Sequence, residues 1–126
     1  MNGLLVQAPW IDLLLAGSKI WEIRGSNTKK RGRIGLIKSG SGMVFGTIDI
    51  VDCKKLSLFD YQQSQKHHCV DDCLELPYKN THVWVMENPM IFDEPVPYQH
   101  PQGAVIWVDL KKAGAWSHSS EKGVQA

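Results

Sequence analysis

The sequence has few cysteines, no long apolar run and little net charge, and each of these absences excludes a class of protein. Its three cysteines, Cys53, Cys69 and Cys73, form an odd set without the spacing of a disulfide-stabilised secreted domain. No apolar run approaches the roughly 20 residues that cross a bilayer. The N-terminus lacks the basic start and long apolar run of a secretory signal. We therefore expect a cytoplasmic protein with free thiols and no membrane partner.

Familiar catalytic and cofactor-binding motifs are also missing. The chain has no serine nucleophile in a recognisable elbow, no Walker loop and no dinucleotide fingerprint, and the turn at 39–42 lacks the lysine and the following helix of a phosphate loop. The stretch His67–Cys73 (HHCVDDC) contains metal-ligating residue types. A structural zinc site needs a second close pair of ligands, and none follows here. We expect no metal and no cofactor.

The length and composition are those of one ordinary globular domain. The 126 residues are 43% hydrophobic and 21% charged, which is enough apolar material for a proper core. From Lys111 onwards the periodicity is lost and the chain becomes rich in serine, lysine and glycine. We predict a domain over residues 1–112 and a poorly ordered tail over 113–126, part of which Trp116 could anchor.

The net charge of +1 hides a strong local asymmetry. Between Lys19 and Lys38 there are seven basic residues and one acid, Glu22, so this window carries +6 and the remainder carries −5. Such a concentration predicts a patch that faces a polyanion, although a solvated charged loop is the alternative. The basic residues are Lys19, Arg24, Lys29, Lys30, Arg31, Arg33 and Lys38.

Short alternating segments predict a β-rich fold. Pro9 suits a helix start and Gly17 suits its end, and Ser57 suits the N-cap of a second helical region that runs to Leu76. Gly46 marks a bend, a bulge or a close backbone contact, and the proline-rich stretch Asn88–Pro101 must be extended and outside the middle of a sheet. The predicted strands are Gly3–Gln7, Lys19–Arg24, Arg33–Ser39, Met43–Cys53, His82–Glu87 and Ala104–Leu110. Together they predict an α+β fold: a small, partly closed β-barrel of about six strands whose openings are capped by two or three short helices.

The densest polar chemistry lies in Gly17–Gly25 (GSKIWEIRG). A period of two places Glu22 and Arg24 on one face of a strand, and Lys19 at its start can reach the same face. Glu22 could accept hydrogen bonds from a base while Arg24 binds phosphate, or Lys19 and Glu22 could act as a catalytic pair. A surface salt bridge is the plain alternative. Trp21 falls on the opposite face, which favours a core position over a stacking platform; Trp10, Trp84 and Trp107 lie in apolar patterns and are also expected in the core.

These segments resemble the ASCH domain over most of 4–110. The resemblance rests on PWIDLLLAGSK followed by IWEIRG, RGRIGLIKSG, GTIDIVDC and HVWVMENP, and on the Gly-x-Lys-x-x-Glu-x-Arg spacing that begins at Gly17. It implies a PUA-like β-barrel with a cleft lined by that motif and a role in RNA metabolism. Some small bacterial members resemble amidohydrolases that deacylate acetylated cytidine with a lysine, a threonine and a distant glutamate. Lys19 and Arg24 match that pattern, whereas Glu22 stands at the threonine position. Ribonuclease activity has also been attributed to the family.

The sequence thus favours a nucleic-acid-binding module that takes RNA, a nucleotide or a nucleoside, with single-stranded DNA as a further candidate. We expect the ligand-binding residues to be Lys19, Glu22, Arg24, Lys29, Lys30, Arg31, Arg33 and Lys38. The alternative is a hydrolase that acts on a modified nucleoside or on RNA, with Lys19 and Glu22 as its catalytic residues. A third hypothesis is a protein-interaction module that uses Asn88–Pro101. No particular oligomeric state is predicted.

Overall fold

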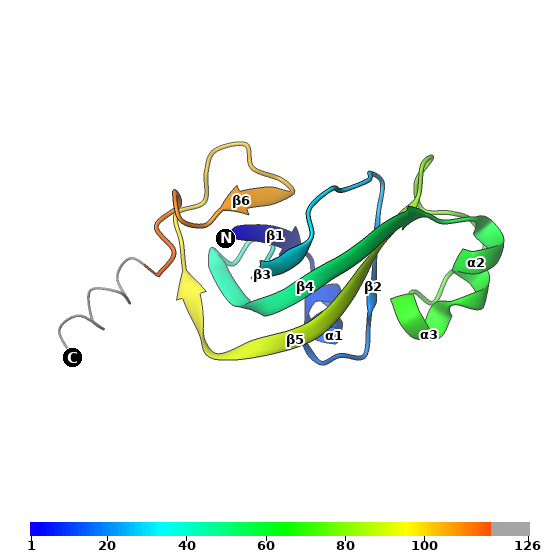
Figure 1. The fold of residues 1–126 in the computed structure, drawn as a ribbon, viewed down its shortest axis with the longest axis horizontal. Coiled ribbons are helices and arrows are strands. Elements are labelled where there is room, and N and C mark those ends of the chain that lie inside the picture. The colour runs from blue at the N-terminus through cyan, green and yellow to red at the C-terminus, as the bar shows by residue number, and fades with distance from the viewer. Residues whose placement is uncertain (117–126) are drawn as a thin grey trace.

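The computed structural model describes residues 1–116, which form one mixed six-stranded sheet with three short helices (Figure 1). The strand order is β2-β5-β4-β3-β1-β6, in which β1 and β3 run parallel and every other neighbouring pair is antiparallel. The elements in chain order are β1 (Asn2–Val6), α1 (Trp10–Leu15), β2 (Trp21–Arg24), β3 (Gly32–Lys38), β4 (Met43–Lys55), α2 (Leu58–Gln63), α3 (Gln65–His68), β5 (His82–Pro97) and β6 (Trp107–Asp109).

The α+β class, the six strands and the short helices agree with the sequence prediction, but the predicted barrel is wrong because the sheet stays open. Its edge strands β2 and β6 are only four and three residues long and do not pair. Side chains bridge the gap instead. The rings of Trp84 in β5 and Trp107 in β6 stack at 5.8 Å although three strands separate β5 from β6 in the sheet order. The sheet therefore curls upon itself without closing its hydrogen-bond ladder.

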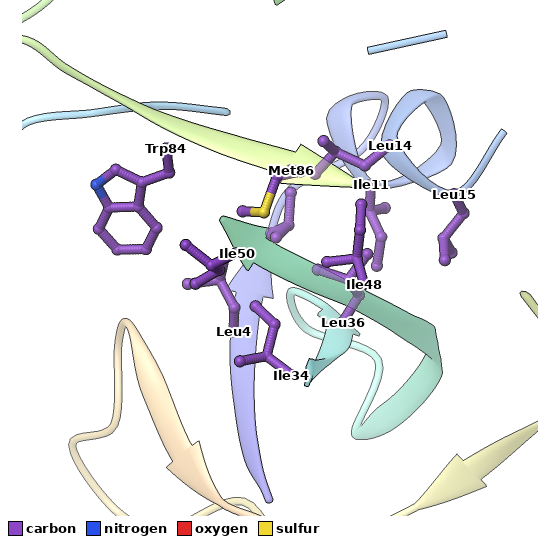
Figure 2. Packing of buried hydrophobic residues seen from close by; sticks show 11 residues of the cluster. Leu4, Ile11, Leu14, Leu15, Ile34, Leu36, Ile48, Ile50, Trp84 and Met86 are labelled. Atoms are coloured by element: carbon purple, nitrogen blue, oxygen red, sulfur yellow. The ribbon is translucent and has the colours of Figure 1, made fainter. Parts of the chain in front are cut away.

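Helix α1 packs on one face of the sheet and forms the main core. Figure 2 shows Ile11, Leu14 and Leu15 of α1 beside Ile48 and Met86 of the two long strands, all of them buried. The opposite face carries a second cluster, because successive residues of a strand alternate between faces. Its buried members are Leu5, Ile37, Val44, Val108, Leu110, Ala113 and Ala115.

Helices α2 and α3 lie at the far end of β4 and β5 from β6 (Figure 1). Ser57 caps α2 as predicted, since its Oγ accepts a hydrogen bond from the Asp60 N–H at 3.1 Å. The predicted helix up to Leu76 is wrong beyond α3, which ends where Cys69 adopts a left-handed conformation with φ of 63°. Beyond α3, side chains accept hydrogen bonds from backbone N–H groups; His68 Nδ1, for example, accepts from the Val70 N–H at 3.0 Å. Cys69 and Cys73 consequently do not share a helix face.

Strand β5 continues ten residues beyond the predicted end at Glu87 and includes three prolines. β2 pairs with β5 only between His82 and Val85, so the remainder of β5 has β4 as its one neighbour among the described strands. Proline lacks an N–H group, and such an edge tolerates it. The prediction that Asn88–Pro101 is extended but outside the middle of the sheet is confirmed as far as β5 extends, to Pro97.

Gly46 lies at a β-bulge and in close contact with a neighbouring backbone, which are two of the three alternatives that the sequence predicted. The register between β4 and β5 shifts between Val44 and Gly46. A side chain at Gly46 would collide with the main-chain oxygen of Met90 and with the Leu15 side chain. Glycine at this position therefore lets α1 and β5 approach the same stretch of β4.

The predicted tail lies mostly outside the described residues, which end at 116. Ala113 and Ala115 are buried, and Trp116 meets Phe92 edge-on at 6.1 Å, so this part of the chain is anchored on β5. Within residues 1–116 every helix is too short to cross a membrane.

Candidate functional site

The end of α1 fixes where the motif begins. Gly17 has a φ of 80°, and its N–H donates to Leu14 O at 3.1 Å, which closes the helix. The Lys19 N–H then donates to Leu13 O at 3.1 Å, so Lys19 is tied to the last turn before β2 begins. Antiparallel pairing of β2 with β5 places Glu22 and Arg24, two residues apart, on one face.

These residues line a cleft of about 350 Å³ between β1, β2 and the segment that follows α3. A cavity of this size falls within the range that small ligands occupy. Its walls combine charged, aromatic and aliphatic side chains: Leu5, Gln7, Trp10, Lys19, Glu22, Ile23, Arg24, Ser39, Tyr61, Val70, Pro77, Tyr78 and Val105.

Glu22 is the centre of a buried ion cluster. Glu22 is 5% exposed. Its Oε2 accepts a hydrogen bond from Arg24 Nε at 2.9 Å and lies 2.8 Å from Arg24 Nη2. Its Oε1 lies 3.8 Å from Lys19 Nζ, which is too long for a hydrogen bond. The alternative of a surface salt bridge is therefore wrong, and Oε1 is the oxygen that remains for a ligand within the described part of the chain.

Arg24 is held from three directions. Besides the Glu22 carboxylate, Nη2 donates to Leu5 O in β1 at 2.8 Å, and the guanidinium carbon lies 5.5 Å from the centre of the Trp84 ring. These bonds occupy Nε and Nη2, so the N–H groups of Nη1 are those left for a ligand when residues 1–116 are considered. A guanidinium held in this way is positioned before any ligand arrives.

Lys19 is almost fully enclosed, with 2% of its surface exposed. Its Nζ donates to His68 O at 2.5 Å and lies 5.0 Å from the centre of the Trp10 ring. Burial lowers the pKa of Lys19, while the nearby Glu22 carboxylate acts in the opposite direction. The energetic cost of burying the ammonium group thus exceeds the stabilisation by the Glu22 carboxylate. Lys19 therefore loses its proton more readily than a lysine in water.

The structure brings together three of the eight predicted binding residues and leaves five outside the cleft lining. Lys29 and Arg31 are exposed on the loop before β3. Arg33 lies 3.0 Å from Asp49 and donates to Asn88 O, on the side of β4 and β5. Lys38 Nζ lies 5.7 Å from the Phe45 ring.

Lys30 is joined to the cleft by a stack of rings. Its Nζ lies 5.0 Å from the Trp107 ring, which stacks on Trp84 with 11° between the planes, and Arg24 lies against Trp84. Each of two stacked indole rings therefore contacts one cation, and these contacts connect the cleft to the basic loop.

Several wall residues had no functional role in the sequence analysis. Trp10, expected in the core, is half-buried and lines the cleft, and Tyr61 and Tyr78 line it too. The position of Trp10 at the first turn of α1, beside the motif, was the available signal.

Trp21 lies outside the cleft lining, and its ring centre lies 5.1 Å from that of His67. Trp21 and Trp107, expected in the core, are half-buried against it, whereas Trp84 is buried as predicted.

His68 was also missed, because its role depends on contacts distant in sequence. It is completely buried, and its main-chain oxygen is the acceptor for Lys19, 49 residues earlier. Among the described residues no group of three or more histidine, cysteine or acidic side chains could hold a metal ion. Cys73 Sγ does lie 4.0 Å from His68 Nε2.

Comparisons with known proteins identify the fold. The family model of the ASCH domain matches residues 4–96. Solved structures of ZmASCH from Zymomonas mobilis are similar over 98% of this chain. A tyrosine-to-phenylalanine variant has 11% identity, 96% coverage of its own chain and a TM-score of 0.68. A serine-to-alanine variant has 10% identity, 94% coverage of its own chain and a TM-score of 0.66. A third ZmASCH structure has 12% identity, 93% coverage of its own chain and a TM-score of 0.63. No curated protein matches.

Proposed function

The chain belongs to the ASCH domain family, and from this membership and the geometry of the cleft we propose that it binds RNA or a free nucleoside through Lys19, Glu22 and Arg24. One observation carries the proposal: a ligand-sized cleft contains a carboxylate and a guanidinium that are fixed by other parts of the protein and still have hydrogen-bonding capacity. Such preorganised groups bind without a large ordering cost.

The groups in the cleft match the parts of a nucleotide. Glu22 Oε1 accepts from an amino or imino group of a base, as carboxylates do with the cytosine amino group. Arg24 Nη1 donates to a carbonyl or phosphate oxygen next to it. Trp10 and Tyr78 supply flat surfaces on which a base can stack. While Lys19 is protonated, the cleft holds two cations and one carboxylate and is net positive, which favours a phosphate-bearing ligand.

The basic loop extends this site for a longer strand. Lys29 and Arg31 are exposed, and Lys30 lies at the outer end of the ring stack that begins at Arg24. These three residues would contact phosphates that flank the bound nucleotide, which would make the affinity fall with salt. Arg33 is already paired with Asp49 and contributes less.

Fluorescence anisotropy with a labelled single-stranded RNA, at low and at physiological salt, tests the proposal. We expect Glu22→Gln to weaken binding about tenfold, since loss of an acceptor for a buried donor costs about 1.4 kcal/mol or more. Lys111→Ala is the matched control, because it removes an exposed charge outside the cleft lining. Competition with nucleosides and with single-stranded DNA identifies the preferred ligand. Absence of binding at low salt, or equal losses in the two variants, would refute the proposal.

A second candidate function, hydrolysis of a modified nucleoside or of RNA, is favoured by one feature of Lys19. Its amine is buried, its pKa is lowered by that burial, and Glu22 lies 3.8 Å away. A neutral amine beside a carboxylate can accept and pass on a proton during attack on a carbonyl or phosphoryl group. Incubation of the protein with acylated nucleosides and with a short RNA, beside Lys19→Ala, tests this function. Turnover that survives the substitution would exclude Lys19 as the catalytic group.

A further inference from the structure

His68 connects three wall residues of the cleft without lining it. Its main-chain oxygen accepts from Lys19, and its ring stacks on Tyr61 with the ring centres 4.6 Å apart. Its Nδ1 accepts from the Val70 N–H. Lys19, Tyr61 and Val70 come from three different parts of the chain, and all three line the cleft.

The two hydrogen bonds of the ring define its protonation state. Nε2 lies 2.6 Å from Tyr61 O, and since a carbonyl oxygen only accepts, Nε2 carries the hydrogen. Nδ1 receives the Val70 N–H at 3.0 Å, so it carries none. His68 is therefore a neutral imidazole with both nitrogens satisfied inside a site from which water is excluded.

Protonation would break one of these bonds. A hydrogen on Nδ1 would face the Val70 N–H, so two donors would meet and the bond would be lost. Among residues 1–116, the groups that act on the ring include no carboxylate that would stabilise an imidazolium. They are Lys19 from the segment before β2, the phenol of Tyr61 on α2, His67 on α3, and the Cys73 thiol after α3.

We propose that His68 is the positioning residue of the cleft, and that its protonation releases the wall at Val70 and weakens ligand binding in acid. The inference rests on the proposed binding function, because it names the regulation of that same site. Val70 is the residue whose bond is lost, and Pro77 and Tyr78 of the same irregular segment line the cleft with it. Burial lowers the pKa of His68 from the usual 6.5, so the transition occurs below that value.

The test combines NMR of the free protein with RNA binding over a titration from about pH 8 to about pH 5. In the free protein we expect the Val70 amide and the Tyr61 amide to shift together with the His68 ring. Binding of a labelled single-stranded RNA should weaken about tenfold over the same range, the effect expected from loss of one buried acceptor. Cleft-wall amides that stay unchanged while His68 titrates would overturn the inference.

Three variants separate positioning from a general structural role. In His68→Asn the side-chain oxygen can replace Nδ1 as the acceptor for Val70 but cannot titrate, so RNA affinity should stay within about threefold at neutral pH and lose its acid dependence. His68→Phe keeps the stack on Tyr61 but removes both ring hydrogen bonds, and it should lower the affinity about tenfold at all pH values. His67→Asn removes the neighbouring histidine and should leave the acid dependence intact.

The outcomes distinguish the two proposals. An unchanged acid dependence in His68→Asn would refute the role of His68. If the wild-type protein binds no RNA at any pH, the proposed function fails, while the coupled shifts of Val70 and Tyr61 still decide whether His68 positions the wall. Thermal unfolding shows whether each variant is folded. If His68→Phe does not fold, His68→Asn alone still tests the role of His68.

Discussion

Arg24 of β2 donates a hydrogen bond from Nη2 to Leu5 O of β1 at 2.8 Å, across the gap that the sheet does not close. β2 is one edge of the sheet, and β1 lies next to the opposite edge strand. The same guanidinium holds the Glu22 carboxylate. One side chain therefore joins the two ends of the curled sheet and orders the centre of the cleft, so fold and site depend on the same contact.

The first prediction concerns the coupling of Glu22 and Arg24. Arg24→Gln should lower the free energy of unfolding by about 3 kcal/mol, because it leaves a buried carboxylate without its hydrogen-bonded cation and with only the more distant Lys19 ammonium. Glu22→Gln with Arg24→Gln should cost clearly less than the two single changes together. Urea unfolding followed by tryptophan fluorescence measures all three variants. Arg33→Gln is the matched control, since Arg33 and Asp49 are more exposed and should contribute about 0.5–1 kcal/mol. Additive effects at Glu22 and Arg24 would contradict the coupling.

The second prediction concerns the pH dependence that Lys19 imposes on stability. Burial lowers the pKa of Lys19, so the unfolded chain holds the proton more tightly than the folded one. Burying the Lys19 ammonium lowers the free energy of unfolding by its full amount below the pKa that Lys19 has in the folded protein. This loss disappears as the pH rises towards the ordinary lysine pKa of 10.5. The free energy of unfolding of the wild type, relative to that of Lys19→Met, should therefore rise with pH in this window. Lys111→Met, at an exposed position, should show no such trend. A difference between wild type and Lys19→Met that stays constant with pH would contradict the prediction.

Local patterns were sufficient to predict much of the geometry of the candidate site. Apolar runs and apolar alternation located the six strands of the described residues, and the proline and glycine that flank α1 predicted its place. A period of two put Glu22 and Arg24 on one face. The predicted strand start at Lys19 is wrong, because β2 begins at Trp21, but Lys19 still reaches Glu22 from two residues before the strand. Each of these features depends on residues within a few positions of one another, which is why the sequence predicts them.

Contacts between distant residues could not be predicted in the same way. The bond from Lys19 to His68 spans 49 residues, and the Trp84 side chain donates to Ser26 O across 58. The sheet stays open because its two edge strands are short and the Trp84–Trp107 stack fills the space between them, neither of which a strand pattern encodes. The irregular path after Cys69 depends likewise on the buried ring of His68.

The third prediction concerns Gly46. A Cβ atom there would collide with the Met90 main-chain oxygen and with Leu15 of α1, and the backbone cannot yield as a flexible side chain could. Gly46→Ala should therefore lower the free energy of unfolding by about 2–3 kcal/mol. Gly40→Ala is the control, since it has open space but a φ of 83°, and it should cost about 1 kcal/mol. Because Gly46 has no positive φ, equal losses in urea unfolding would show that the close contact at Gly46 costs no more than the strained conformation at Gly40, which would contradict the prediction.

The last prediction concerns Trp107, whose ring closes the curled sheet against Trp84. Trp107→Ala removes this stack and the contact with Lys30, and it should lower the free energy of unfolding by about 2–3 kcal/mol. Trp107→Phe keeps an aromatic ring and should lose about half as much. Lys30→Ala should cost about 0.5–1 kcal/mol in the wild type and nothing in Trp107→Ala, because the cation then has no ring to contact. Urea unfolding measures the losses, and a red shift of tryptophan emission in Trp107→Ala reports the exposure of Trp84. An unchanged unfolding midpoint in Trp107→Ala would contradict a stabilising role of the Trp84–Trp107 stack.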